Sequence, residues 1–257
     1  MFKDSLLNIV QIMNTLPTEG VLFLLYILSI AFMLSFHKLF GSLGLKLFMT
    51  LGIVLVNIKV LKGMKLDCFP EPIVMGTVLM GSVFLATDIL AEYYGLKDAK
   101  QGIWMSFLGI LFVAVMMLVT LGVAPVNLGD FPQCEDMVLA HHAMERLFLP
   151  TPAILLASLI SYLISQYVDV TTFLQMKFWT NGRYLWIRTA TATILSAFID
   201  NCIFSFLAWK IFHPIAMSNG QFIQSYILGA FLLRLCVAAL NVPVIYWVRR
   251  QKKDYFS

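Results

Sequence analysis

The feature that most limits the fold is a series of apolar blocks, each long enough to cross a bilayer. In one of them, residues 101–129 contain no charged side chain. A transmembrane helix needs about 20 mostly apolar residues, because the hydrocarbon core is about 30 Å thick. Only 12% of the chain is charged and 60% is hydrophobic, whereas soluble domains carry about 25% charged residues. We therefore predict an all-α, polytopic protein that forms a single integral membrane domain over residues 1–257.

The apolar blocks predict seven membrane spans. These are Val21–Phe40, Leu45–Leu61, Pro72–Glu92, Gly102–Val123, Thr151–Phe173, Trp186–Phe212 and Phe222–Val248. Residues 1–18 precede them as a weakly amphipathic segment. The long polar connection at 124–149 is expected to hold a short helix from Glu135 to Phe148.

The distribution of Lys and Arg favours an outer N-terminus and a cytoplasmic C-terminus. In that orientation eleven of these residues lie on the inner side and six on the outer side, in keeping with the enrichment of basic residues in cytoplasmic segments. The inner group ends in a cluster from Arg249 to Lys253, which we interpret as a cytoplasmic anchor and not as a nucleic-acid site. Cys68 and Cys134 then share the outer side, where the sequence allows either a disulfide or two free thiols.

Two carboxylates interrupt the end of the third predicted span. Asp88 and Glu92 are four residues apart, so on a helix they share one face. A carboxylate exposed to hydrocarbon costs at least about 2.5–3.5 kcal/mol, which favours a polar seam that faces protein or water. The alternative is that the pair marks the frayed end of a membrane helix before Gly95.

The fifth and sixth predicted spans carry similar polar stripes. Ser165, Asp169 and Phe173 recur as Ser196, Asp200 and Phe204 at the same four-residue spacing, which places each set on one helix face. Asp200 is the only charged residue in 189–209, and Arg234 in the last span is its expected counter-charge. This pair has either a functional or a purely structural role. Asp169 is either part of the same site or an interfacial residue.

These residue types predict a site for a small polar ligand between helices. Carboxylates accept hydrogen bonds from N–H groups, amides donate and accept, and aromatic rings offer stacking faces. The adjacent His141 and His142 do not predict a metal site, because neighbouring side chains diverge on a helix. An intramembrane enzyme is not favoured, because the chain has no His-x-x-x-His or Gly-x-Ser-x-Gly pattern. We expect no enzymatic activity, no metal and no cofactor.

Three segments resemble the queuosine precursor transporter family. The first runs Phe84-Leu-Ala-Thr-Asp-Ile-Leu-Ala-Glu-Tyr-Tyr-Gly-Leu-Lys-Asp-Ala99. The other two are similar to its Ala-Ser…Gln-x-x-Asp-x-x-x-Phe and Arg…Ser…Asp-x-x-x-Phe helices, and are carried by Ala157, Ser158, Gln166, Asp169 and Phe173, and by Arg188, Ser196, Asp200 and Phe204. Asn57, Pro243 and Tyr246 also match family positions. The basic run after Gly95 is thinner than in many relatives.

The resemblance covers about 49–250 and implies a six-helix core, related in outline to the substrate-binding components of energy-coupling-factor vitamin transporters. The first span, at about 20–41, is then an addition to that core. The family imports 7-deazaguanine bases or queuine for transfer RNA modification, through the bacterial inner (plasma) membrane. The implied partners are this small molecule and membrane lipid, with no nucleic acid; whether the protein forms a homodimer is left open.

The implied substrate-binding residues combine carboxylates, amides, arginines and aromatic rings. They are Asn57, Phe84, Asp88, Glu92, Gln166, Asp169, Arg188, Asp200, Phe204 and Arg234. The alternative function is a vitamin-binding or nucleobase-binding component that needs a separate ATPase module. Neither the preferred base nor proton coupling is determined by the sequence.

Overall fold

The computed structural model describes residues 2–59, 62–66, 73–127, 129, 131–148, 151–212 and 228–255. Its helices are α1 (Phe2–Thr15), α2 (Thr18–Lys59), α3 (Thr77–Tyr93), α4 (Leu96–Leu121), α5 (Glu135–Phe148), α6 (Thr151–Trp179), α7 (Leu185–Phe206) and α9 (Ala230–Tyr255). A short 3-10 helix, η1 (Pro132–Cys134), precedes α5, and a π-helical turn, η2 (Leu207–Phe212), extends α7. Strands β1 (Gly63–Met64) and β2 (Ile73–Val74) form an antiparallel pair.

Five of the described helices are long and apolar enough to cross a membrane. They are α2, α4, residues Ile154–Trp179 of α6, α7 and residues Ala230–Arg250 of α9. The chain is therefore an all-α, polytopic membrane protein, as predicted. Two helices account for the difference from the seven predicted spans. The helix α2 covers the first two predicted spans but counts as one helix, and α3 is too short to be included. With 17 residues and a rise of 1.5 Å per residue, α3 is roughly 25 Å long, a little less than the hydrocarbon thickness.

The helix α2 is divided by a sharp bend at Gly41. This residue has φ 59° and ψ −131°, a left-handed backbone that glycine adopts without steric cost. A side chain on Gly44 would lie only 1.9 Å from the carbonyl oxygen of Phe36, although residues eight apart in a straight helix are about 12 Å apart. The chain therefore reverses direction at Gly41, between the first and the second predicted span.

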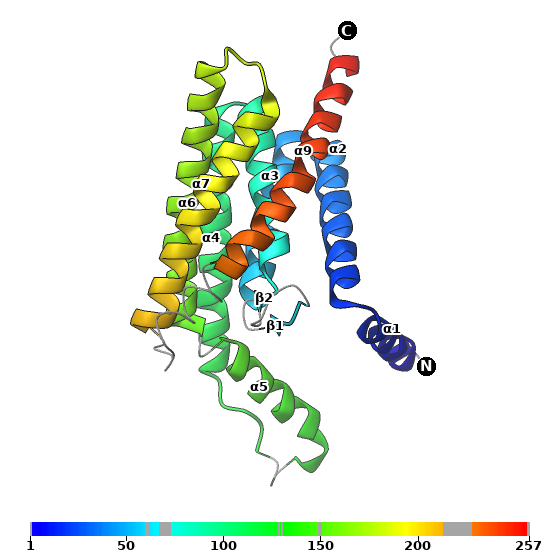
Figure 1. Ribbon diagram of the computed structural model, residues 1–257. Helices are drawn as coiled ribbons and strands as arrows, with labels where there is room; N and C mark the ends of the chain where they lie inside the picture. The colour runs from blue at the N-terminus through cyan, green and yellow to red at the C-terminus, as the bar shows by residue number, and fades with distance from the viewer. Residues whose placement is uncertain are drawn as a thin grey trace.

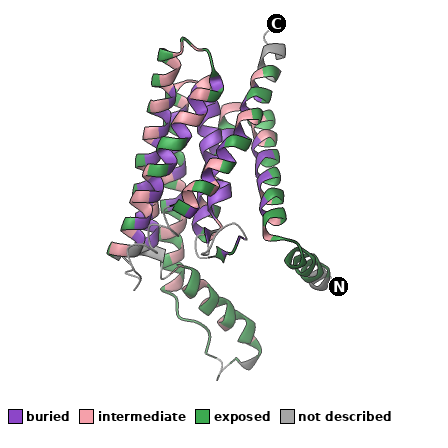
Figure 2. Cartoon of the chain, in the orientation of Figure 1, coloured by how far each residue is buried: buried purple, intermediate pink, exposed green. Residues whose placement is uncertain are grey.

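The short helix α3 lies at the centre of the molecule. Every residue from Thr77 to Ala91 is buried, and α3 packs against α2, α4, α6 and α9. Figure 2 shows this buried helix between more exposed ones. Because other helices surround it, α3 can carry polar side chains without exposing them to lipid.

Small residues allow the helices around α3 to approach closely. An added Cβ would lie 2.7 Å from Val83 at Gly52 and 2.4 Å from Val237 at Gly81. Small residues at helix contacts are typical of membrane proteins, in which close van der Waals packing drives helix association. Gly81 thus sets the distance between α3 and α9.

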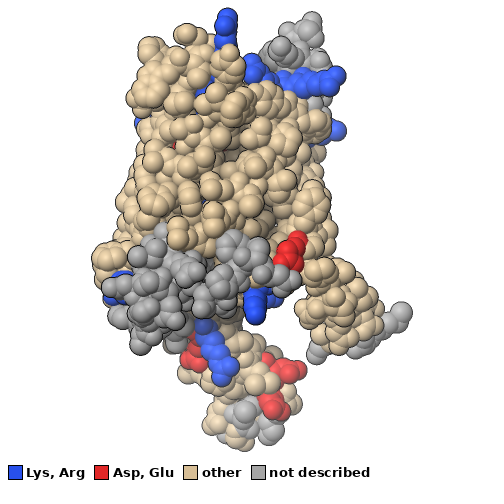
Figure 3. Space-filling view, viewed as in Figure 1, with Lys and Arg blue, Asp and Glu red and all other residues tan. Residues whose placement is uncertain are grey.

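The connections between helices gather at two opposite ends of the bundle. The α3–α4 turn, the α6–α7 loop and the C-terminus lie at one end, and α1, the β1–β2 pair and α5 lie at the other (Figure 1). The bend of α2 joins the first group, because His37 is 3.0 Å from the hydroxyl of Tyr94, next to α3. On the face in Figure 3, Lys and Arg gather near both ends and leave a largely uncharged middle. The connections therefore fall into the same two groups that the Lys and Arg count compares (Figure 1). Which of the two ends is cytoplasmic stays a prediction.

Helix α5 can be compared with its predicted bounds, whereas two other predicted features lie outside the described residues. The helix α5 has the predicted bounds, Glu135 and Phe148. Cys68 and the beginning of the seventh predicted span, residues 222–227, lie outside the described residues. The disulfide between Cys68 and Cys134 therefore stays a prediction.

Candidate functional site

A column of polar side chains runs between α3, α6, α7 and α9. We define this polar column by its members: Phe84, Asp88, Glu92, Ser161, Ser165, Gln166, Asp169, Phe173, Lys177, Arg188, Ser196, Asp200 and Arg234. It has three levels, one around Glu92, one around Asp88 and Asp169, and one around Asp200. Along α3 the successive members are four residues apart and share one helix face, as the sequence predicts.

At the first level, Glu92 is held by two cations. The guanidinium of Arg188 donates to both Glu92 oxygens, at 3.0 and 3.1 Å, and Lys177 lies 2.9 Å from Oε2. Arg188 is completely buried and stacks over Phe173, with 5.3 Å from Cζ to the ring centroid. Such a two-pronged contact fixes both geometry and charge. Glu92 therefore joins α3 to α6 and α7.

The second level contains two carboxylates without a cationic partner of their own. Asp88 on α3 and Asp169 on α6 are electrostatic neighbours and are 1% and 0% exposed. Asp169 accepts a hydrogen bond from Ser196 at 2.8 Å. Within the described part of the chain, both oxygens of Asp88 and Oδ2 of Asp169 have no hydrogen-bond partner.

An amide lies next to this carboxylate pair. Thr87, which precedes Asp88, donates to Oε1 of Gln166 at 2.9 Å. Gln166 is fully buried, and its Nε2 has no partner among the described residues. Because Gln166 is one helical turn before Asp169, its unused donor belongs to the second level.

At the third level, Asp200 binds the expected counter-charge. Oδ2 of Asp200 lies 2.5 Å from a guanidinium nitrogen of Arg234. Ser161 donates to the same carboxylate, and Ser165 donates to Oδ1 at 3.2 Å. Arg234 also stacks over Phe84, 5.8 Å from the ring centroid. Its Nε and Nη1 atoms have no partner among the residues that the structure describes.

The two polar stripes form reciprocal hydrogen bonds across the α6–α7 contact. Ser165 of α6 donates to Asp200 of α7, and Ser196 of α7 donates to Asp169 of α6. The predicted facing of the two stripes is confirmed. The exposed fraction of Asp169 is 0%, so its side chain is enclosed between helices and does not lie at an exposed interface. Asp88 lies within the buried part of α3, five residues before its end, and not at a frayed helix end.

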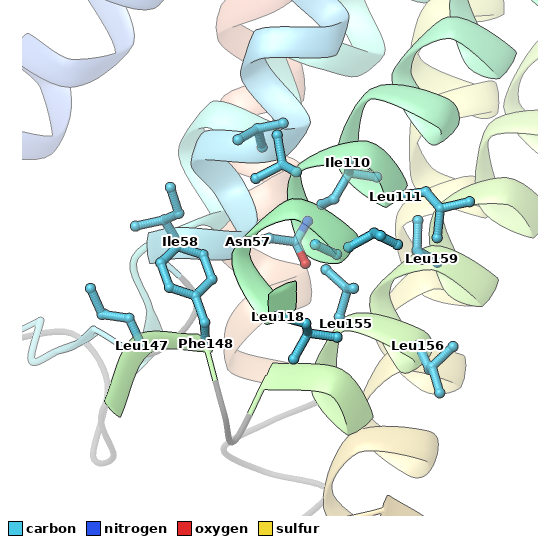
Figure 4. A pocket seen from close by; sticks show the side chains of 14 residues that line it. Asn57, Ile58, Ile110, Leu111, Leu118, Leu147, Phe148, Leu155, Leu156 and Leu159 are labelled. Carbon is cyan, nitrogen blue, oxygen red and sulfur yellow. The ribbon is translucent and has the colours of Figure 1, made fainter. Parts of the chain in front are cut away.

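One of the predicted substrate-binding residues, Asn57, lies at a separate pocket. Asn57 donates to its own helix at the carbonyl of Ile53, at 2.9 Å. It lines a pocket of about 260 Å³ between α2, α4, the end of α5 and the beginning of α6, whose other walls are apolar (Figure 4). Phe204 is half-buried near the end of α7.

Several important contacts were not predicted from the sequence. Ser161 and Lys177 extend the stripe of α6 by one step of four residues at each end, so the spacing alone could have revealed them. Asn241 donates to the carbonyl of Gly81 at 3.0 Å and accepts from Tyr26 at 3.2 Å. This buried amide connects α9, α3 and α2, and no periodic pattern indicates it.

The His141–His142 pair has an acidic neighbour on the same helix. Glu145 lies 3.4 Å from His141 and 2.9 Å from His142. The hydrogen bond with His142 is the main cause that holds the pKa of Glu145 below its usual value. Among the described residues, no group of three His, Cys, Asp or Glu side chains is arranged to hold a metal ion.

Comparison with known proteins adds a family to this geometry. A family described as "putative vitamin uptake transporter" matches residues 74–248, a range that contains almost all of α3 to α9. A protein of Bacillus subtilis (strain 168) named "probable queuosine precursor transporter" is 28% identical over 218 residues, which are 84% of this chain and 88% of that protein. No solved structure gives a significant match. The chain therefore belongs to the vitamin uptake transporter family.

Proposed function

We propose that this protein imports a queuosine precursor, a 7-deazaguanine base or queuine, and binds it in the polar column. The observation that carries the proposal is a set of four carboxylates between helices of a membrane protein: Asp88, Asp169 and Asp200 are buried, and Glu92 is partly buried. Ionisable residues within membrane spans are expensive and mark substrate pathways. The name of the Bacillus subtilis relative supports the choice of substrate.

The chemistry of the column suits a deazaguanine ring. Such a ring presents an N–H and an exocyclic amine on one edge, and a carboxylate such as Asp200 accepts both. The ring carbonyl needs a donor, and Gln166 and Arg234 have N–H groups without a partner among the described residues. The flat face of the base can stack on Phe84, whose ring already receives the Arg234 guanidinium.

The substrate reaches this column only if helices move apart, since Asp88, Gln166 and Asp169 are at most 1% exposed. Transporters bind their substrates near the middle of the bilayer and open the site alternately to each side. We infer seven crossings, two of them in α2 on either side of Gly41 and one in α3. We further infer that the N-terminus is outside and the C-terminus is in the cytoplasm, with the protein in the bacterial inner membrane.

The pocket beside Asn57 is a weaker candidate for the same substrate. Apart from this one amide its lining is apolar, and the Asn57 Nδ2 atom is already bonded to Ile53. A base with several donors and acceptors would leave most of them unpaired there, and each would cost about 1–3 kcal/mol. The polar column offers enough partners to avoid that cost.

Uptake by vesicles that contain only this chain tests the proposal. The purified protein is reconstituted into liposomes, and entry of a labelled 7-deazaguanine is measured with and without competing purine bases. We expect saturable uptake that unlabelled deazaguanines suppress and guanine suppresses less. If the protein binds the base but takes it up only after an ATPase module is added, the vitamin-binding component is favoured instead. If the protein shows no binding and no uptake, both functions are contradicted.

A further inference from the structure

The charges of the polar column do not balance, and the excess negative charge lies at its second level. Glu92 is matched by Arg188 and Lys177, and Asp200 is matched by Arg234. The remaining carboxylates, Asp88 and Asp169, have no ion pair among the described residues. Four carboxylates thus face three cations within the column, so the column as a whole lacks one positive charge.

The surrounding elements do not supply the missing charge. The charged groups that act on Asp88 are Asp169, Glu92 and Arg188, and Arg188 is already committed to Glu92. From the helices that pack against α3 on its other sides, Lys46 of α2 is bound to Asp98 of α4, at 2.6 Å. In α9, Arg234 is bound to Asp200.

Asp88 and Asp169 lie where α3 contacts α6, next to the 2.9 Å hydrogen bond from Thr87 to Gln166. Two buried carboxylates that neighbour each other there do not both stay ionised, because each raises the cost of charging the other. One proton shared by the pair makes the column neutral. Gln166 adds a second indication of a ligand at this level, since its Nε2 is fully buried and has no partner among the described residues.

We propose that Asp88 and Asp169 form a subsite for a single positive charge, which a proton occupies in the closed column and the ammonium group of a cationic ligand occupies when the column opens. The exchange is balanced, because one proton leaves the pair as one ammonium group arrives. An uncharged ligand leaves the proton in place. The inference rests on the proposed function and identifies the preferred substrate class, a 7-deazaguanine that carries an aminomethyl group.

Binding to the purified full-length protein tests the subsite with two ligands of similar size. One is 7-aminomethyl-7-deazaguanine, a cation, and the other carries an uncharged nitrile in place of the aminomethyl group. We expect the wild type to prefer the amine by about tenfold at about pH 8, since a hydrogen bond to a charged group is worth roughly 1.5–3 kcal/mol. Because about one proton leaves as the amine binds, each pH unit below 8 should lower the affinity for the amine about tenfold, so the preference should vanish near pH 7. The affinity for the nitrile should not change with pH.

The variants Asp88→Asn and Asp169→Asn should each lower the affinity for the amine far more than the affinity for the nitrile, so that the preference for the amine is lost. Asp136→Asn is the matched control, because Asp136 is an exposed acid on α5, and it should behave as the wild type. Calorimetry of the wild type in buffers of different ionisation enthalpy provides a test without any variant. We expect release of about one proton when the amine binds and none when the nitrile binds.

The outcomes separate this inference from the proposed function. A wild type that binds both ligands equally at every pH and releases no proton would overturn the subsite and leave the transporter function intact. A preference that persists in both column variants would also overturn it. A wild type that binds neither ligand would overturn the proposed function together with the subsite.

Discussion

The guanidinium of Arg234 on α9 lies 2.5 Å from Oδ2 of Asp200 on α7, and both side chains are at least nine-tenths buried. This contact ties the last helix to the bundle at the level where Phe84 of α3 also meets Arg234. Breaking a buried pair on one side leaves the other charge uncompensated and typically costs about 3–5 kcal/mol.

Asp200→Asn should therefore lower both substrate affinity and stability. Affinity should fall by about tenfold or more, because one acceptor becomes a donor that faces a ligand N–H. Thermal unfolding in detergent, with and without substrate, measures both effects. A second change, Arg234→Met, should restore part of the lost stability but not the affinity, since it removes the stranded charge. A lower melting temperature with an unchanged substrate-induced shift would show that Asp200 only clamps the helices.

Asp88→Asn and Glu92→Gln should affect the protein in different ways. Glu92→Gln leaves Arg188 without its two-pronged partner and should lower the melting temperature. Asp88→Asn removes a carboxylate without a hydrogen-bond partner in the described chain, so it should leave the fold intact or stabilise it while uptake of the aminomethyl base is lost. Melting curves and liposome uptake of both variants check this order. A stable Glu92→Gln protein beside an unfolded Asp88→Asn protein would contradict it.

Gly81→Ala should weaken the contact between α3 and α9. The new methyl group would lie 2.4 Å from Cγ1 of Val237, and the β-branched valine has little freedom to turn away. Overpacking of this kind costs about 1–3 kcal/mol. Gly20→Ala is the control, because its Cβ would meet nothing closer than 4.0 Å and helix propensity favours alanine. Equal melting temperatures for the two variants would show that α9 moves away without cost.

The bond between Tyr26 and Asn241 should contribute to the docking of the first half of α2. Tyr26→Phe removes one buried hydrogen bond of 3.2 Å and should cost about 1 kcal/mol. Asn241→Ala also leaves the carbonyl of Gly81 without this donor and should cost more. Urea or thermal unfolding in detergent gives both values, with the exposed Tyr246→Phe as control. A larger loss for Tyr26→Phe than for Asn241→Ala would contradict the proposed network.

The orientation predicts which end of the chain a membrane-impermeant thiol reagent reaches. In a cysteine-free background, Ser5→Cys in intact cells should react from outside, and Tyr255→Cys should react only after the membrane is opened. The reason is the excess of Lys and Arg at the end that holds the C-terminus. Labelling in the reverse order would invert the topology and place Cys68 and Cys134 in the reducing cytoplasm.

The sequence by itself determined the class of protein and most residues of the column. Long apolar blocks leave few alternatives to membrane helices, because backbone polar groups must be satisfied inside the bilayer. The four-residue spacing of Asp88 and Glu92, and of Ser196 and Asp200, places each pair on one face whatever the tertiary fold. Asp200 stood out because charge in the middle of an apolar span requires a partner, and the structure supplies Arg234.

Only the tertiary structure decided which charges compensate each other. Spacing along one helix does not show which residue of another helix lies opposite, so the pairing of Glu92 with Arg188 could not be predicted. Asn57 was placed in the site by the family resemblance, and spacing along its helix could not show that it lines a mainly apolar pocket. The same reason explains why Asn241 was missed and why the unmatched pair of Asp88 and Asp169 became visible only when α3 and α6 were seen side by side. Compensation of buried charge depends on distances between helices, and these are set by packing.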